Sequence, residues 1–101
     1  MSIQPNETYV LDLLKELLDT PSPTGYTQDI MKRIEQEAAT LNVSLEWNEK
    51  GGANLSVPGQ DGSRTVGLSA HVDTLGAMVR AVKSEGTLRL TSVGGYMMNS
   101  I

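Results

Sequence analysis

One short segment in the second half of the chain restricts the fold more than any other. Residues 65–70 read TVGLSA, a run of small and mostly apolar side chains without charge. Such a run is typical of a strand that is covered on both faces, as in sheets with helices on each side. The sequence therefore predicts an α/β fold in which this strand is central and needs cover on both sides.

Two amphipathic helices are predicted before that strand. Over residues 7–19, apolar side chains recur at helical spacing, charged side chains fill the opposite face, and Asn6 is a candidate N-cap. Residues 20–25 (TPSPTG) end this helix, because Pro21 biases the preceding residue away from helical backbone. A second helix is predicted over residues 27–41. Its apolar stripe consists of Ile30, Met31, Ile34, Ala38 and Leu41.

The rest of the chain is a series of short strands and turns. Strands are predicted over residues 43–47, 53–57, 65–70, 78–82 and 87–91. Gly-rich or polar segments separate them, including Gly51-Gly52 and residues 58–63. The length of 101 residues fits one folded unit, but two helices do not cover every face of these strands. This imbalance is a first indication of a larger domain.

Composition argues against several classes of function. The chain carries 8 Lys+Arg against 12 Asp+Glu, a formal net charge of −4, which argues against nucleic acid as a partner. Cysteine is absent, so disulfides, thiolate metal sites and a cysteine nucleophile are excluded. The N-terminal residues lack a basic stretch, and charges interrupt the Leu-rich segment. We therefore expect no signal peptide and no membrane span, hence a soluble cytoplasmic protein.

The segment that follows residues 65–70 carries the candidate chemistry. His71 is the single histidine of the chain, and Asp73 projects to the same side if the backbone stays extended. A carboxylate in that position fixes the imidazole tautomer and leaves the other ring nitrogen as a metal ligand. From spacing alone, a His-x-Asp pair at a strand end is more often a hydrogen-bonded surface pair. One His and one Asp also fall short of the three or four protein ligands of a zinc site.

Three motifs resemble one family of enzymes. Residues 17–26 (LLDTPSPTGY), 70–79 (AHVDTLGAMV) and 90–96 (LTSVGGY) occur in the order found in co-catalytic metallo-aminopeptidases. The resemblance is to the glutamyl aminopeptidase and deblocking (tetrahedral) aminopeptidase group, some of whose members have carried endoglucanase labels. It extends from about Val10 to Ile101.

The resemblance implies a fold and a role for two residues. The fold is the three-layer αβα catalytic domain of the zinc exopeptidases. His71 corresponds to the first metal ligand, and Asp73 to the catalytic aspartate that orients its imidazole. Gly25 and Tyr26 match the turn into the second helix, and Gly94-Gly95 permit a turn towards the family's dimerisation insert. Residues 1–101 would be the N-terminal part of the catalytic domain, ending before that insert and before the remaining ligands.

The function that the resemblance implies is hydrolysis of N-terminal residues from peptides. Two divalent metal ions, Zn²⁺ or Co²⁺, would activate a water molecule, and a Glu from the missing part would accept its proton. With at most one ligand, residues 1–101 alone are expected to be inactive. The resemblance further implies a homo-oligomeric parent, from a dimer to a dodecamer. From charge and hydropathy, neither nucleic acid nor a membrane is expected as a partner. No residue of the substrate pocket is identified.

Two other functions remain open at this point. The related di-zinc dipeptidases, carboxypeptidases and deacylases also use a strand-end His-x-Asp followed by Thr, though as a rule without a nearby VGGY stretch. The chain could instead be a non-catalytic binding or assembly module, because two amphipathic helices and strands with open edges can pair with a partner.

Overall fold

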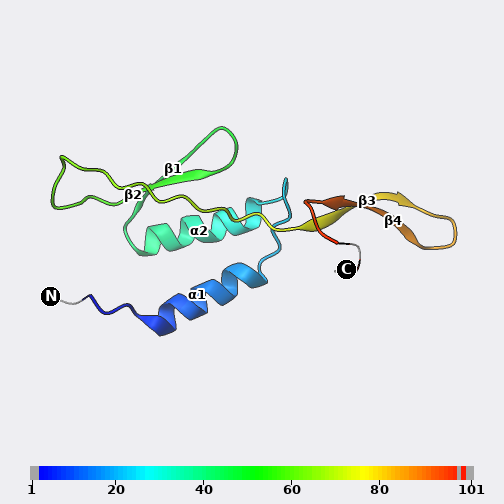
Figure 1. The fold of residues 1–101 in the computed structure, drawn as a ribbon, viewed down its shortest axis with the longest axis horizontal. Helices are drawn as coiled ribbons and strands as arrows, with labels where there is room; N and C mark the ends of the chain where they lie inside the picture. The colour runs from blue at the N-terminus through cyan, green and yellow to red at the C-terminus, as the bar shows by residue number, and fades with distance from the viewer. Residues whose placement is uncertain (1–2, 98, 100–101) are drawn as a thin grey trace.

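Two helices precede two β-hairpins in an elongated molecule (Figure 1). The computed structural model describes residues 3–97 and 99. Its principal extents are 63 × 32 × 24 Å and its radius of gyration is 18.4 Å, against about 13 Å for a compact domain of 100 residues. The accessible surface of 8998 Å² likewise exceeds the roughly 5,600 Å² of a compact protein of this mass. Much of the apolar surface is therefore uncovered.

Helix α1 (Glu7–Asp19) forms as the sequence predicts. The side chain of Asn6 accepts a hydrogen bond from the Tyr9 backbone N–H, which satisfies one of the free donors of the first turn. The backbone leaves the helical region at Thr20, before Pro21. None of its residues is buried, and Leu11 and Leu18 are 63% and 72% exposed. Leu13 and Leu17 are half-buried, so the described residues cover the apolar face of α1 only in part.

Helix α2 (Gln28–Thr40) carries the small core of the molecule. Ile30, Met31 and Ala38 of the predicted stripe are buried, whereas Leu41 follows the helix and is largely exposed. Strand β1 (Ser44–Trp47) contacts this helix, and the Trp47 indole N–H donates to Glu35 at 2.9 Å. The buried apolar side chains found among the described residues therefore all belong to α2.

A polar network joins the two helices. The Arg33 guanidinium contacts Glu16 of α1 at 2.6 Å and Glu37 of its own helix at 2.7 Å. The Tyr9 hydroxyl donates to the same Glu37 carboxylate. This hydrogen bond, followed by those from Arg33, lowers the pKa of Glu37 below its ordinary value. The two helices are thus linked by charged and hydroxyl groups, in addition to their chain connection.

Acidification is expected to remove the contribution of the Tyr9–Glu37 hydrogen bond to stability. A carboxyl group with a lowered pKa stabilises the fold above its unfolded pKa, and this stabilisation is lost as the pH falls through the folded value. Melting curves of wild type and Tyr9→Phe between about pH 7 and 3 test this expectation. The difference in Tm should shrink at low pH. A difference that does not change with pH would contradict the assignment, because the other acidic groups titrate equally in both proteins.

Four strands pair into two separate antiparallel hairpins. Strand β1 pairs with β2 (Ala53–Ser56), and β3 (Gly76–Val82) pairs with β4 (Leu88–Val93). These bounds lie within a few residues of the predicted strands. The order of elements, two helices and then strands, is the predicted one. Within the described residues the strands form two two-stranded sheets.

An irregularity in β3 gives its hairpin one apolar face. Val79 lies opposite Leu90 and Val82 opposite Leu88, with a register shift between them at Arg80. Because Leu88 and Leu90 are two residues apart, they point to the same face, and the shift brings both valines onto that face. All four side chains are about half exposed or more.

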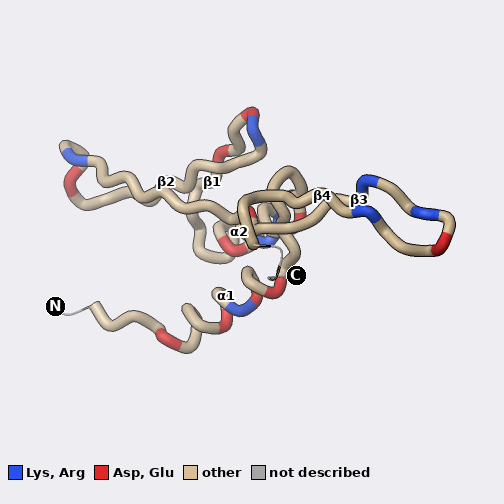
Figure 2. The backbone as a smooth tube through the Cα atoms, turned by 45° about the vertical axis from the view of Figure 1, so that its right-hand side comes forward, with Lys and Arg blue, Asp and Glu red and all other residues tan. Residues whose placement is uncertain are grey.

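Charged side chains of both signs are spread along the chain (Figure 2). The β3–β4 hairpin is net positive, unlike the chain as a whole, because it carries Arg80, Lys83 and Arg89 against Glu85. In the part of the chain that the structure describes, neither helix has the length and apolar character needed to cross a membrane.

The prediction for residues 65–70 is wrong in this structure. These residues are extended but pair with no other strand, and all of them are exposed, including Val66 at 81% and Leu68 at 97%. The small apolar composition suits a covered strand, but a strand forms only by pairing with at least one neighbour, and none of the described residues pairs with this segment. The segment leaves two rows of backbone polar groups facing solvent.

Candidate functional site

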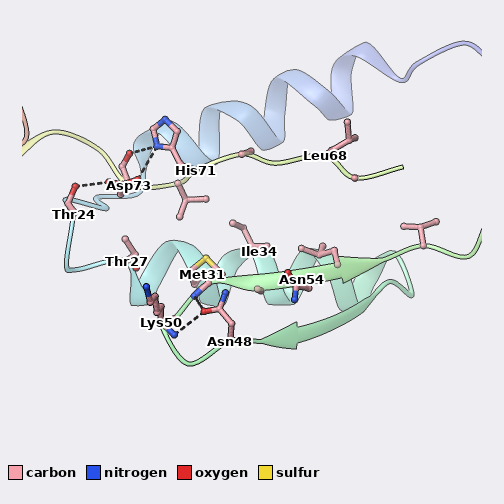
Figure 3. A pocket seen from close by; sticks show the side chains of 18 of the residues that line it. Thr24, Thr27, Met31, Ile34, Asn48, Lys50, Asn54, Leu68, His71 and Asp73 are labelled. Carbon is pink, nitrogen blue, oxygen red and sulfur yellow. Dashed lines mark hydrogen bonds and ion pairs between the residues drawn. The ribbon is translucent and has the colours of Figure 1, made fainter. Parts of the chain in front are cut away.

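His71 and Asp73 meet where the extended segment reaches β3 (Figure 3). The imidazole Nδ1 lies 3.0 Å from Asp73 Oδ1 and 3.1 Å from the Asp73 backbone carbonyl oxygen. The His71 side chain is 83% exposed and is directed away from α2. The predicted pairing of these two residues is therefore present, with the ring open to solvent.

The two contacts at Nδ1 determine the tautomer of the neutral imidazole. A carbonyl oxygen can only accept, and an ionised carboxylate is also an acceptor. Nδ1 must therefore carry the proton, an assignment made from its hydrogen-bond partners. Nε2 is then left with its lone pair in the exposed part of the ring, which is the state that a metal ion requires of a histidine ligand.

A third residue, Thr24, completes the arrangement around the carboxylate. Its Oγ1 donates to Asp73 Oδ2 at 2.7 Å, so each carboxylate oxygen has one side-chain partner. The Thr24 hydrogen bond, followed by that from His71, lowers the pKa of Asp73 below its ordinary value. Asp73 is thus held ionised at neutral pH. Sequence spacing did not predict this contact of Thr24, because the two residues are 49 positions apart.

The turn that carries Thr24 is fixed to the segment that carries Asp73. The buried Ser22 hydroxyl donates to the Val72 carbonyl at 2.7 Å. The Thr74 N–H donates to the Ser22 carbonyl at 2.8 Å, and the Thr24 N–H donates to the Thr74 carbonyl at 3.2 Å. These bonds form a short parallel bridge between Pro23 and Thr74. The turn after α1 therefore sets the backbone on which the site lies.

Two glycines allow this close arrangement. Gly25, which the sequence marks as architectural, has φ +90° and lets the turn enter α2. Gly76 lies against the ring of Pro23, where a Cβ would stand 2.6 Å from the proline Cβ. The Tyr96 hydroxyl also contacts this glycine, because it donates to the Gly76 carbonyl at 2.9 Å. Gly94 has φ +89°, which confirms that it permits a turn.

A groove of about 1010 Å³ runs from the site along α2 and β2. Thr24 and Asp73 stand at one end, and Met31 and Ile34 line its α2 side (Figure 3). Leu68 of the unpaired segment lines the side opposite α2. The groove thus joins a polar end to a largely apolar length.

The site offers one ligand to a metal ion, the imidazole of His71. His71 Nε2 is exposed and unprotonated, as a divalent ion requires, and Asp73 contacts the other ring nitrogen, Nδ1. Over residues 3–97 and 99, His, Cys, Asp and Glu side chains nowhere gather in threes or more to hold a metal ion. Any metal bound here would need further ligands from elsewhere.

The chain is similar to aminopeptidases of known sequence. Residues 51–101 match the family model described as M42 glutamyl aminopeptidase. "Putative aminopeptidase YhfE" of Bacillus subtilis (strain 168) is 45% identical over 91 residues, which cover 90% of this chain and 26% of that protein. "Glutamyl aminopeptidase" of Lactococcus lactis subsp. cremoris (strain MG1363) is 23% identical over 88 residues, 86% of this chain and 25% of that protein. The chain thus spans about a quarter of the length of these curated relatives.

Proposed function

Because this chain belongs to the M42 glutamyl aminopeptidase family, we propose that it forms part of a metal-dependent aminopeptidase. His71 supplies one metal ligand through Nε2, and Asp73 orients the imidazole. The observation that carries the proposal is the position of Nδ1 between two acceptors of Asp73, which leaves the exposed Nε2 unprotonated. The remaining ligands come from polypeptide outside the 101 residues.

The residues of this chain have limited and distinct tasks in that reaction. A pair of divalent ions, Zn²⁺ or Co²⁺, supplies the Lewis acidity and the activated water when bound. His71 offers a neutral nitrogen donor, Asp73 holds the proton on Nδ1, and the turn at Ser22 fixes the backbone between them. The substrate is the N-terminal residue of a peptide, as the names of the relatives suggest.

The exposed surface of the molecule supports a larger working protein. Apolar side chains are left exposed on α1, on the unpaired residues 65–70 and on one face of the β3–β4 hairpin. Further polypeptide of the same domain would cover them. We propose that residues 1–101 alone have no peptidase activity.

A hybrid enzyme tests the proposed function. In the hybrid, this chain replaces the matched 26% of the Bacillus subtilis relative, to which it is 45% identical. With Zn²⁺ or Co²⁺ supplied, the hybrid should hydrolyse aminoacyl anilides, whereas the 101-residue chain should not. The unaltered relative is the positive control. Robust turnover by the isolated chain would contradict the proposal, as would a folded, metal-loaded hybrid without activity towards substrates that the relative cleaves.

A further inference from the structure

The Asp73 carboxylate is held from two sides. Oδ1 faces His71, and Oδ2 accepts from Thr24 Oγ1 at 2.7 Å. The backbone of Thr24 is itself fixed, because its N–H donates to Thr74, the residue after Asp73. Hydroxyl and carboxylate are therefore set relative to each other by main-chain bonds on both sides of the contact.

We propose that Thr24 is a positioning residue for the candidate metal site. Its hydroxyl fixes the rotation of the Asp73 carboxylate so that Oδ1 stays on the Nδ1–H of His71, and Nε2 stays available. The relevance to catalysis rests on the proposed function, but the effect on His71 is a property of this chain.

The carboxylate needs such an anchor for physical reasons. The terminal torsion of an aspartate is broad and has no strong staggered preference. The Asp73 side chain is also 40% exposed, so water competes for both oxygens. Thr24 is β-branched, which limits its own χ1 rotation and directs the hydroxyl. Fixing Oδ2 therefore orders Oδ1.

Ser22 has a different task, although it lies in the same turn. Its buried hydroxyl donates to the Val72 backbone carbonyl and not to the carboxylate. The Ser22 hydroxyl thus holds the main chain, whereas the Thr24 hydroxyl lies 2.7 Å from the Asp73 carboxylate and more distantly, at 3.4 Å, from the Thr74 carbonyl. The two effects can be separated by a measurement that reports on the imidazole itself.

Long-range ¹H–¹⁵N correlation NMR of the chain supplies that measurement. His71 is the single histidine, so its two ring nitrogens give the only imidazole signals. At about pH 9, where imidazoles are neutral, wild type and Thr24→Ser should be mainly protonated on Nδ1. Thr24→Val keeps the shape without the hydroxyl and should lower the Nδ1–H to Nε2–H ratio about fivefold, the change expected for one ordinary hydrogen bond. Asp73→Ala defines the ratio without the carboxylate.

Thr20→Val is the matched control. Thr20 lies four residues before Thr24, and its hydroxyl donates to the Glu16 carbonyl of α1 and not to the site. The tautomer ratio should therefore stay at the wild-type value. Circular dichroism checks the fold of each variant, and Thr24→Ala serves as a smaller second replacement.

Two results would overturn the proposal. One is a wild-type ratio in folded Thr24→Val or Thr24→Ala. The other is loss of the native fold in both variants while Thr24→Ser stays folded, which would make the hydroxyl structural. Because no metal or substrate is present, a failure here is distinct from a failure of the hybrid enzyme.

Discussion

Replacing His71 by alanine in the hybrid enzyme should lower kcat/KM for aminoacyl anilides more than about 100-fold. Loss of a residue that orients a metal ligand typically costs 10–100-fold, and loss of the ligand itself should cost more. The Asp73→Asn substitution should lower kcat/KM by about 10–100-fold, because Nε2 is still present but the tautomer of the imidazole is less well fixed. Steady-state kinetics at saturating Zn²⁺ or Co²⁺ provide the comparison.

The control for these two variants lies far from the site. Ser84→Ala removes an exposed hydroxyl in the β3–β4 turn, where it contacts Glu85, and should leave kcat/KM unchanged. The assignment of His71 would be wrong if His71→Ala kept activity within a few-fold of the hybrid. Full activity of the Asp73→Asn variant would rule out an orienting role for the carboxylate. It would not contradict the assignment of His71 as a metal ligand.

Gly76→Ala should destabilise the chain and disturb the site at once. The added Cβ would stand 2.6 Å from the Pro23 Cβ, and a proline ring cannot rotate away. The turn at Pro23 or the start of β3 must therefore shift, at a cost of about 1–3 kcal/mol in the free energy of unfolding. Because Thr24 follows Pro23, the shift should also lower the Nδ1–H fraction of His71.

Gly62→Ala is the matched control for this substitution. Gly62 lies in the exposed loop after β2, with nothing within 4 Å of the added Cβ, so the change in stability should stay within about 0.5 kcal/mol. Urea unfolding followed by circular dichroism measures both variants. Equal stability of Gly76→Ala and Gly62→Ala would mean that the Pro23–Gly76 contact does not constrain the site.

The parts of the fold that depend on neighbouring residues were predictable from sequence. Helix α1 follows from apolar spacing and from Asn6, whose side chain caps it as expected. His71 and Asp73 are two residues apart, so an extended backbone was enough to predict their contact. Each of these features depends on residues that are close in sequence, and sequence patterns can therefore predict it.

The features that were missed depend on distant residues. The Thr24–Asp73 contact joins positions 49 apart, and no spacing rule links a turn after one helix to the start of a later strand. The register shift in β3 reflects pairing with β4 and is not visible in β3 alone. Residues 65–70 were predicted as a covered strand because of their composition, but a strand forms only where neighbours pair with it.

Metal content of the purified hybrid enzyme tests the central claim most directly. If His71 is a ligand, the wild-type hybrid should hold two divalent ions per chain after dialysis, and His71→Ala should hold one or none. Elemental analysis of both proteins, with Ser84→Ala beside them, gives the answer independently of substrate. Two tightly held ions in His71→Ala would contradict the assignment of His71 as a metal ligand.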